Sequence, residues 1–218
     1  MPQQGKSRGF FITLEGPEGS GKSSQARWLT RWLRRGGREV ILVRDPGSTA
    51  LGRALRRVLL HSASEWSPLA EALVFIGGRA QLVAERIRPA LARGAIVVCD
   101  RFHDSTVAYQ GFGGGVEIGR LSAWGRRAIA GLMPDLTLVL DVPVDVGLAR
   151  RAGRPRDRME RKALAFHRRV RQGYLTLAKR EPRRLVVVDA AASPQIVRAR
   201  IVAILSKVSD TFCAGKSV

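Results

Sequence analysis

Short apolar runs alternate with longer amphipathic segments along this chain. Five runs rich in valine, leucine, isoleucine and phenylalanine have the length and composition of buried β-strands, and they occupy residues 9–14, 39–44, 95–99, 136–141 and 185–189. Between the runs, apolar residues recur three and four positions apart, which is the spacing of helices that cover a sheet. This alternation predicts one parallel sheet with helices on both faces. We therefore expect an α/β fold of three layers, with a five-stranded parallel sheet flanked by helices.

The same spacing sets the expected boundaries of the domain. Helices are predicted to begin near Lys22, to cover residues 50–60, 68–92, 116–132 and 159–179, and to begin at Pro143 and Pro194. We find no internal repeat and no domain linker, so residues 10–205 are expected to form a single domain, with residues 1–9 and 206–218 as tails. Residues 150–160 are rich in arginine and broken by glycine and proline. They are expected to form either a solvated loop or a small lid that clamps phosphate.

The loop after the first predicted strand carries the clearest chemical signal. Residues 16–23 read G-x-x-x-x-G-K-S, the pattern of a phosphate-binding loop (P-loop), and they lie between a strand and a helix as that motif requires, which argues against a glycine-rich turn that binds nothing. Glycines let backbone N–H groups turn towards phosphate oxygens, and the positive end of the helix dipole points at the same oxygens. Lys22 can reach the β- and γ-phosphates, and the Ser23 hydroxyl can ligate Mg²⁺. The residues predicted to bind ATP are Gly16, Pro17, Glu18, Gly19, Ser20, Gly21, Lys22, Ser23 and Ser24.

Composition narrows the class of protein and leaves the charge to be explained. The 218 residues are enough for one α/β domain, and no apolar run approaches the length that spans a membrane. The first nine residues lack the apolar segment of a secretory signal, and two cysteines do not make a disulfide framework, so we expect a cytoplasmic protein. Lysine and arginine number 38 against 18 acidic residues, a net charge of +20. Because the basic residues are spread along the chain, solvated arginines and a basic nucleotide cleft explain this charge better than nucleic-acid binding.

Polar residues after a strand and on one helix are further candidates for chemistry. Asp100 and Arg101 follow the most apolar run directly, at the sheet edge where ligands bind in open α/β folds. A carboxylate suits Mg²⁺ or its waters, and a guanidinium suits an acceptor phosphate. Phe75 and Arg79 stand one helical turn apart, so a ring and a guanidinium on one face can stack on a base and hydrogen-bond to it. Taken singly, Phe75 would be a core residue and Arg79 a solvated one.

Three blocks of the sequence together resemble the thymidylate kinase family, over about residues 10–205. Residues 15–24 resemble its E-G-x-[DE]-G-x-G-K-[ST]-[ST] loop, and residues 157–160 with the helix after them resemble its lid. Residues 98–110, V-C-D-R-F-H-D-S-T-V-A-Y-Q, fit the family signature and are the most specific block, because generic phosphate-loop proteins do not share it. The resemblance implies a P-loop kinase that transfers the γ-phosphate of ATP to dTMP, with Mg²⁺ as cofactor. It also implies a homodimer built through helices.

The resemblance assigns roles to individual residues of this chain. By that resemblance, Phe75 would stack on thymine, Arg79 would bond its carbonyl edge, and Tyr109 would lie where a ribose 2′-hydroxyl must go. The residues implied for catalysis are Lys22, Asp100, Arg101, Arg150 and Arg154, with Ser23 and Asp100 at the metal. The set implied for dTMP is Glu18, Asp45, Pro46, Phe75, Arg79, Arg101, Ser105, Thr106, Tyr109 and Gln110.

Departures from the family pattern leave parts of the site open. Some members carry an arginine where this chain has Gly19, and the crowded lid arginines would supply that charge here. Asp45 and Ser48 replace a glutamate and a glycine of the usual R-E-P-G-G-T stretch, and Lys162 stands where many members have an acidic residue. Two alternatives stay open: a kinase for another nucleoside monophosphate or a small alcohol, and a basic nucleic-acid-binding protein that uses ATP as a switch. The paired ring and guanidinium argue against the first, and an aromatic content of 6% argues against the second.

Overall fold

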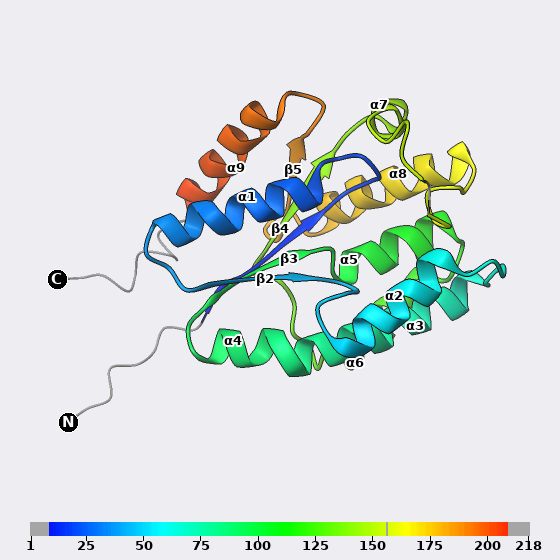
Figure 1. The fold of residues 1–218 in the computed structure, drawn as a ribbon, viewed down its shortest axis with the longest axis horizontal. Coiled ribbons are helices and arrows are strands. Elements are labelled where there is room, and N and C mark those ends of the chain that lie inside the picture. Colours follow the sequence, from blue (N-terminus) through cyan, green and yellow to red (C-terminus); the bar gives the residue numbers. More distant parts are fainter. Residues whose placement is uncertain (1–8, 156, 209–218) are drawn as a thin grey trace.

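Five parallel strands form the centre of the molecule (Figure 1). The computed structural model describes residues 9–155 and 157–208. Of the predicted tails, residues 1–8 and 209–218 lie outside this range, and residues 206–208 prolong the last helix. The strands are β1 (Phe11–Glu15), β2 (Val40–Arg44), β3 (Ile96–Asp100), β4 (Leu136–Asp141) and β5 (Leu185–Asp189), in the spatial order β2-β3-β1-β4-β5. Every neighbouring pair is parallel, so the predicted five-stranded parallel sheet is confirmed.

The remaining regular elements are helices, and two segments among them are π-helical. They are α1 (Lys22–Arg35), α2 (Ala50–His61), α3 (Pro68–Leu82), η1 (Val83–Ile87), α4 (Arg88–Ala92), α5 (His103–Thr106), η2 (Val107–Gly113), α6 (Ile118–Ala128), α7 (Val144–Ala149), α8 (Leu164–Arg180) and α9 (Pro194–Val208). The segment predicted as one helix over 68–92 is continuous, but η1 interrupts its α-helical hydrogen bonding. Within the described part of the chain, no helix is both long and apolar enough to cross a membrane.

Helices cover both faces of the sheet, which gives the three predicted layers (Figure 1). Successive side chains of a strand point to opposite faces, so neighbours in β1 belong to different cores. Ile12 packs with the apolar residues of α1 and α9, whereas Phe11 packs with those of η1 and α4. β1 and β3 are parallel neighbours that are buried along their whole length. The polar groups at and directly after their last residues therefore lie together at the carboxyl edge of the sheet.

The helix boundaries that differ most from the predicted ones are the end of α6 and the start of α8. Helix α6 ends at residue 128 and not at 132, because the backbone enters the left-handed region at Ala130 (φ 47°). Residues 159–163 form turns and irregular structure, and α8 begins only at Leu164. The Asp157 carboxylate accepts the backbone N–H groups of Met159 (2.9 Å) and Glu160 (3.0 Å) at the first of these turns.

Candidate active site

The loop between β1 and α1 has the backbone of a phosphate cradle. Gly16, Gly19 and Gly21 have φ values of 137°, 69° and 86°, which favour glycine. A Cβ on Gly19 would lie 1.9 Å from the carbonyl oxygen of Gly147 in α7, and a Cβ on Gly147 would lie 2.3 Å from the carbonyl oxygen of Glu18. The two backbones are therefore in direct contact, and no side chain fits at position 19 while α7 keeps its place.

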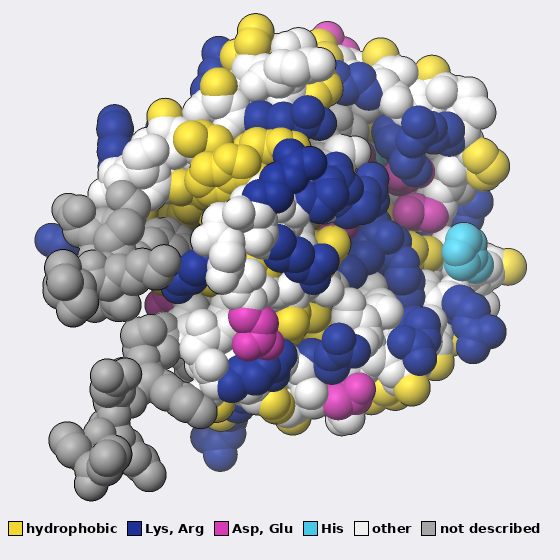
Figure 2. Space-filling model, turned by 60° about the vertical axis from the view of Figure 1, so that its left-hand side comes forward, with side chains coloured by type: hydrophobic (Ala, Val, Ile, Leu, Met, Phe, Trp, Pro, Cys, Tyr) yellow, Lys and Arg dark blue, Asp and Glu magenta, His cyan; other side chains and the backbone are white. Residues whose placement is uncertain are grey.

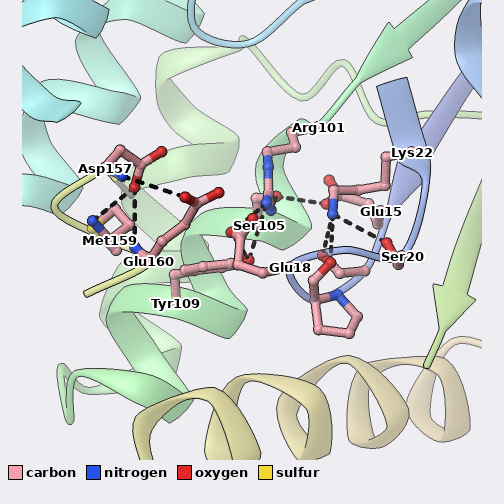
Figure 3. Close-up of polar contacts among 12 residues, drawn as sticks. Glu15, Glu18, Ser20, Lys22, Arg101, Ser105, Tyr109, Asp157, Met159 and Glu160 are labelled. Atoms are coloured by element: carbon pink, nitrogen blue, oxygen red, sulfur yellow. Dashed lines mark hydrogen bonds and ion pairs between the residues drawn. The ribbon is translucent and has the colours of Figure 1, made fainter. Parts of the chain in front are cut away.

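Lys22 begins α1 and turns back over the loop (Figure 3). Its ammonium donates to the carbonyl oxygens of Gly16 (2.9 Å) and Pro17 (2.6 Å) and to Ser20 Oγ (3.2 Å). Burial and the charge of Arg101 disfavour the protonated form and lower the pKa of Lys22 to about 8. The side chain thus holds its ammonium against the loop, where a positive charge suits phosphate.

Ser23 and Asp100 meet where α1 begins and β3 ends. The Ser23 hydroxyl donates to Asp100 Oδ2 at 2.5 Å. The Arg44 guanidinium lies 3.3 Å from each of these side chains. Among the described residues, no group of three or more His, Cys, Asp or Glu side chains is placed to hold a metal ion. A cation at Ser23 and Asp100 would therefore take its other ligands from phosphate and water.

Arg101 reaches from the end of β3 to the phosphate-binding loop. Its φ of 71° is uncommon for a residue other than glycine. The guanidinium donates to Glu18 (2.8 Å) and to the Tyr109 hydroxyl (3.0 Å), and this hydroxyl donates to Glu18 (2.7 Å) (Figure 3). Burial favours the neutral form of Glu18, but the charges of Arg101 and Lys22 outweigh it and lower the pKa of Glu18 to about 2.

A buried carboxylate at the end of β1 completes this polar network. Glu15 is 0% exposed, and it accepts hydrogen bonds from the backbone N–H of Phe102 (2.7 Å), from Ser105 (2.6 Å) and from Tyr174 (2.9 Å). Burial and the nearby charge of Asp104 raise the pKa of Glu15 to about 7. Glu15 was not among the site residues predicted from the sequence, although it is the first residue of the loop motif over residues 15–24 and an acidic residue at the end of an apolar run.

The helix α3 presents Arg79 and Phe75 to the same cavity. Arg79 is 1% exposed, so it is not the solvated residue that was expected when it was considered without Phe75. Its Nε lies 2.5 Å from Asp45 Oδ2, and its Nη2 donates to Thr106 Oγ1 at 2.8 Å. Its Nη1 is buried and has no hydrogen-bond partner among the described residues. Phe75 lies one turn earlier and lines the cavity beside it.

The arginines of the predicted lid have different surroundings. The Arg150 guanidinium donates to the carbonyl oxygens of Ala190 (2.8 Å) and Ala191 (2.7 Å), in the loop after β5. The guanidinium of Arg154 makes no hydrogen bond or ion pair with residues 9–155 and 157–208. Both residues line the cavity. Arg156, the fourth arginine of this stretch, lies outside the described residues.

The carboxyl end of the predicted lid is held to α3 by ion pairs. Glu71 on α3 is 1% exposed, and it forms ion pairs with Arg158 and with Lys162, the latter at 3.2 Å. Arg151 pairs with Glu160 at 2.5 Å within the lid. The lysine at position 162 thus has an acidic partner on α3, which explains how the chain accommodates a basic residue there.

One cavity of about 510 Å³ collects the predicted site residues. Of the residues predicted for nucleotides, metal and catalysis, those that line it are Glu18, Gly19, Gly21, Lys22, Ser23, Ser24, Asp45, Pro46, Phe75, Arg79, Asp100, Arg101, Ser105, Thr106, Tyr109, Gln110, Arg150 and Arg154. Gly16, Pro17 and Ser20 belong to the loop but are not among the lining residues. The cavity also takes in Arg44 and Arg56, which were not predicted as site residues. Burial and the charges of Arg44 and Arg101 lower the pKa of Arg56 to about 10.

Fold and site together define a P-loop nucleotide kinase, in which a phosphate cradle and a pocket with a paired aromatic ring and guanidinium share one cavity. The family model described as thymidylate kinase matches residues 14–201. The chain is 48% identical to a thymidylate kinase of Synechococcus over 95% of its length and 99% of that protein, and 48% identical to one of Pseudomonas putida with the same coverage. It is also similar to the crystal structure of thymidylate kinase from Ehrlichia chaffeensis, with a TM-score of 0.75, 33% identity, and coverage of 91% of this chain and 99% of that one. The chain belongs to the thymidylate kinase family, and it phosphorylates dTMP with ATP.

Proposed function

We propose that the P-loop side of the cavity binds the phosphates of ATP and that the Arg101 side binds the phosphate of dTMP. The observation that carries this assignment is the hydrogen bond from Arg101 to Glu18, because it brings the acceptor side against the donor loop. Lys22, Arg44, Arg56 and Arg101 line the same cavity. Their mutual repulsion favours an anion there, and two phosphate groups supply the missing negative charge.

Ser23 and Asp100 fit a Mg²⁺ ion that accompanies ATP. Their hydroxyl and carboxylate oxygens are adjacent, and hard oxygen donors are the ligands that this ion prefers. Mg²⁺ usually takes one or two protein ligands beside phosphate oxygens and water, and when bound it neutralises charge on the phosphates. Lys22, together with Arg150 and Arg154 of the lid, would stabilise the charge that develops on the transferred phosphoryl group.

The thymine base fits between Phe75 and Arg79. Asp45 and Thr106 hold two nitrogens of the Arg79 guanidinium, so the third nitrogen is fixed in place before a base arrives. That nitrogen has no partner among the described residues and can donate to a carbonyl oxygen of thymine. Tyr109, held by Arg101 and Glu18, would leave no room for a ribose 2′-hydroxyl. Pro46, Ser105 and Gln110 complete the proposed dTMP pocket.

A homodimer is proposed through the face formed by α2, α3 and α6. Helix α3 packs against both α2 and α6, as Figure 1 also shows. Large apolar side chains on these three helices remain exposed, between 39% and 51%: Leu51, Val58, Leu69, Leu73 and Trp124. An apolar face spread over adjacent helices favours association with a second copy, which would bury it.

The basic charge is proposed to serve the nucleotide cleft and solubility, and not the binding of nucleic acid. Figure 2 shows lysine and arginine side chains over much of one face, with apolar side chains between them. Such a distribution differs from a single basic groove with interleaved aromatics, which binding of a single strand requires. We place the enzyme in the cytoplasm because its two substrates, ATP and dTMP, are cellular metabolites.

The experiment that tests these assignments is an ADP-release assay over a panel of nucleoside monophosphates, with and without Mg²⁺. We expect turnover with dTMP that depends on Mg²⁺, and little turnover with ribonucleotides. In the same assay, Arg101→Ala should raise the KM for dTMP, whereas the matched variant Arg88→Ala should not, because Arg88 contacts the carbonyl oxygens of Ile129 and Ala130 away from the cavity. Equal turnover of dTMP and its ribose counterpart would refute the Tyr109 assignment. Elution as a monomer in size-exclusion chromatography would refute the dimer.

A further inference from the structure

The turn that carries Arg101 is held by the carboxyl end of the neighbouring strand. Arg101 has a left-handed φ of 71°, which costs a residue with a Cβ on the order of 1–2 kcal/mol. The backbone N–H of Arg101 donates to the carbonyl oxygen of Leu14 (3.1 Å), and the next N–H, of Phe102, donates to Glu15 Oε1 (2.7 Å). β1 therefore fixes both peptide groups of a turn whose conformation aims the guanidinium at the cavity.

The second carboxylate oxygen of Glu15 acts on the guanidinium itself, through two hydroxyls. Arg101 Nη1 donates to Ser105 Oγ (3.2 Å) and to the Tyr174 hydroxyl (3.4 Å). Both hydroxyls lie within hydrogen-bond distance of Glu15 Oε2, at 2.6 Å and 2.9 Å (Figure 3 shows Glu15, Ser105 and Arg101). A hydroxyl carries one hydrogen, so it presents a lone pair to Arg101 only if its hydrogen goes elsewhere. The two hydroxyls also lie 2.9 Å apart, so one of them can donate to the other, and Glu15 Oε2 is the acceptor for the hydrogen that remains.

We propose that Glu15 is a positioning residue for recognition of the acceptor phosphate, which sets the place and direction of Arg101 without touching the substrate. This inference rests on the proposed role of Arg101 at the phosphate of dTMP. Glu15 is fully buried and is not among the residues that line the cavity, so it acts through Arg101. A buried carboxylate is costly in an apolar sheet, and here its lone pairs are used by one backbone donor and two hydroxyls.

The hydrogen bonds that run from Arg101 through Ser105 and Tyr174 to Glu15 form a relay, and Glu15→Gln tests this relay with almost no change in side-chain size. The N–H of Phe102 can only donate, so the amide oxygen of glutamine must face it. The NH₂ group is then left facing Ser105 and Tyr174, which must turn lone pairs towards it. One hydroxyl can still donate to the other, but the second hydroxyl hydrogen has no acceptor left and is turned towards Arg101. Donor then meets donor at the guanidinium, and a hydrogen bond to a charged group is lost. A substitution that keeps volume thus reverses the polarity of the relay.

The assay is calorimetric binding of dTMP, thymidine and ATP to the full-length protein. We expect Glu15→Gln to weaken dTMP binding by about tenfold, equivalent to about 1.4 kcal/mol, because the phosphate loses a correctly aimed guanidinium. Thymidine, which has the same base and sugar but no phosphate, should bind within about twofold of wild type, and so should ATP. A merely structural role would weaken dTMP and thymidine alike, and that outcome overturns the proposal.

Three further variants separate the possible failures. Thr13→Val removes another buried hydrogen bond on the same face of β1, to Thr137 (2.8 Å), and should leave the ratio of thymidine to dTMP affinity unchanged. Tyr174→Phe removes one hydroxyl of the relay and should lower dTMP affinity selectively, so the proposal stays testable if Glu15→Gln does not fold. If Arg101→Ala leaves dTMP binding intact, the proposed role of Arg101 fails. If Arg101→Ala weakens dTMP while Glu15→Gln and Tyr174→Phe do not, the positioning role alone fails.

Discussion

Replacing Arg79 with methionine should destabilise the protein as strongly as any single change in the site. Methionine keeps much of the length and apolar stem of arginine but removes the charge. Asp45 is 2% exposed and faces Arg79 at 2.5 Å, so the variant leaves a buried carboxylate without its partner. Breaking a buried ion pair from one side costs about 3–5 kcal/mol. For a protein of this size, each kcal/mol lowers the Tm by about 2–4 °C, which gives a fall of about 6–20 °C.

The pH dependence of this loss has a definite sign. Burial raises the pKa of Asp45, and the charge of Arg79 opposes that rise. Without Arg79 the pKa rises further. A carboxyl whose pKa is higher in the folded than in the unfolded state contributes stability below its unfolded pKa and loses it as the pH rises through the folded value. The deficit of Arg79→Met should therefore be small in acid and grow towards neutral pH.

Urea unfolding at about pH 5 and about pH 8 measures both effects, with wild type alongside. The double variant Arg79→Met, Asp45→Asn removes the stranded charge as well and should recover about half or more of the lost stability. A loss below about 1 kcal/mol that is the same at both pH values would show that the Asp45 carboxylate is not stranded by the change. Failure of Asp45→Asn to restore any stability would refute the same reasoning independently.

Three further variants test the phosphate loop, the base pocket and the lid. Lys22→Ala should lower kcat on the order of 10²-fold or more with little change in thermal stability, because one ammonium at the transferring phosphate is lost; near-normal turnover in a folded variant would contradict the loop assignment. Phe75→Ala should raise the KM for dTMP by roughly one to two orders of magnitude at saturating ATP, since base–aromatic stacking is worth about 1–3 kcal/mol, and an unchanged KM would make Phe75 a packing residue. Replacing Arg150 and Arg154 together with alanine should lower the single-turnover rate on the order of 10³-fold while ATP affinity changes little. A rate within about twofold of wild type would assign both arginines to the solvated surface.

Local patterns in the sequence were sufficient wherever a residue's role depends on its chain neighbours. The P-loop follows from a strand, a glycine spacing and a helix that are contiguous, and the structure has β1, the loop and α1 at those places. Phe75 and Arg79 share a helix face because they are one turn apart, and both line the cavity. Arg79 was expected to be solvated when taken alone because its partners, Asp45 and Thr106, come from other elements.

Residues whose partners are remote in the chain could not be found in this way. The donors to Glu15 lie 87, 90 and 159 residues away, so nothing near Glu15 in the sequence signals that its carboxylate would be satisfied. Arg150 is similar, since its carbonyl partners follow about 40 residues later. Arg56 belongs to a basic stretch on α2 in which only the fold decides which arginine faces the cavity. The sequence gives the type of each of these residues, but it does not show which residues distant in the chain will contact one another.

The contact between Gly19 and Gly147 limits how this enzyme can change in evolution or by design. α7 leads directly into the arginine-rich segment predicted as a lid, so the packing of α7 against the loop also fixes where this segment begins. An arginine in place of Gly19 would require a different position of α7, because the first side-chain atom would already collide with the backbone of Gly147. A single substitution at position 19 would therefore disrupt the packing of α7 against the loop, whatever charge the new side chain carried. Moving the positive charge from this arginine-rich segment to the loop would therefore require a shift of the α7 backbone as well as the new side chain.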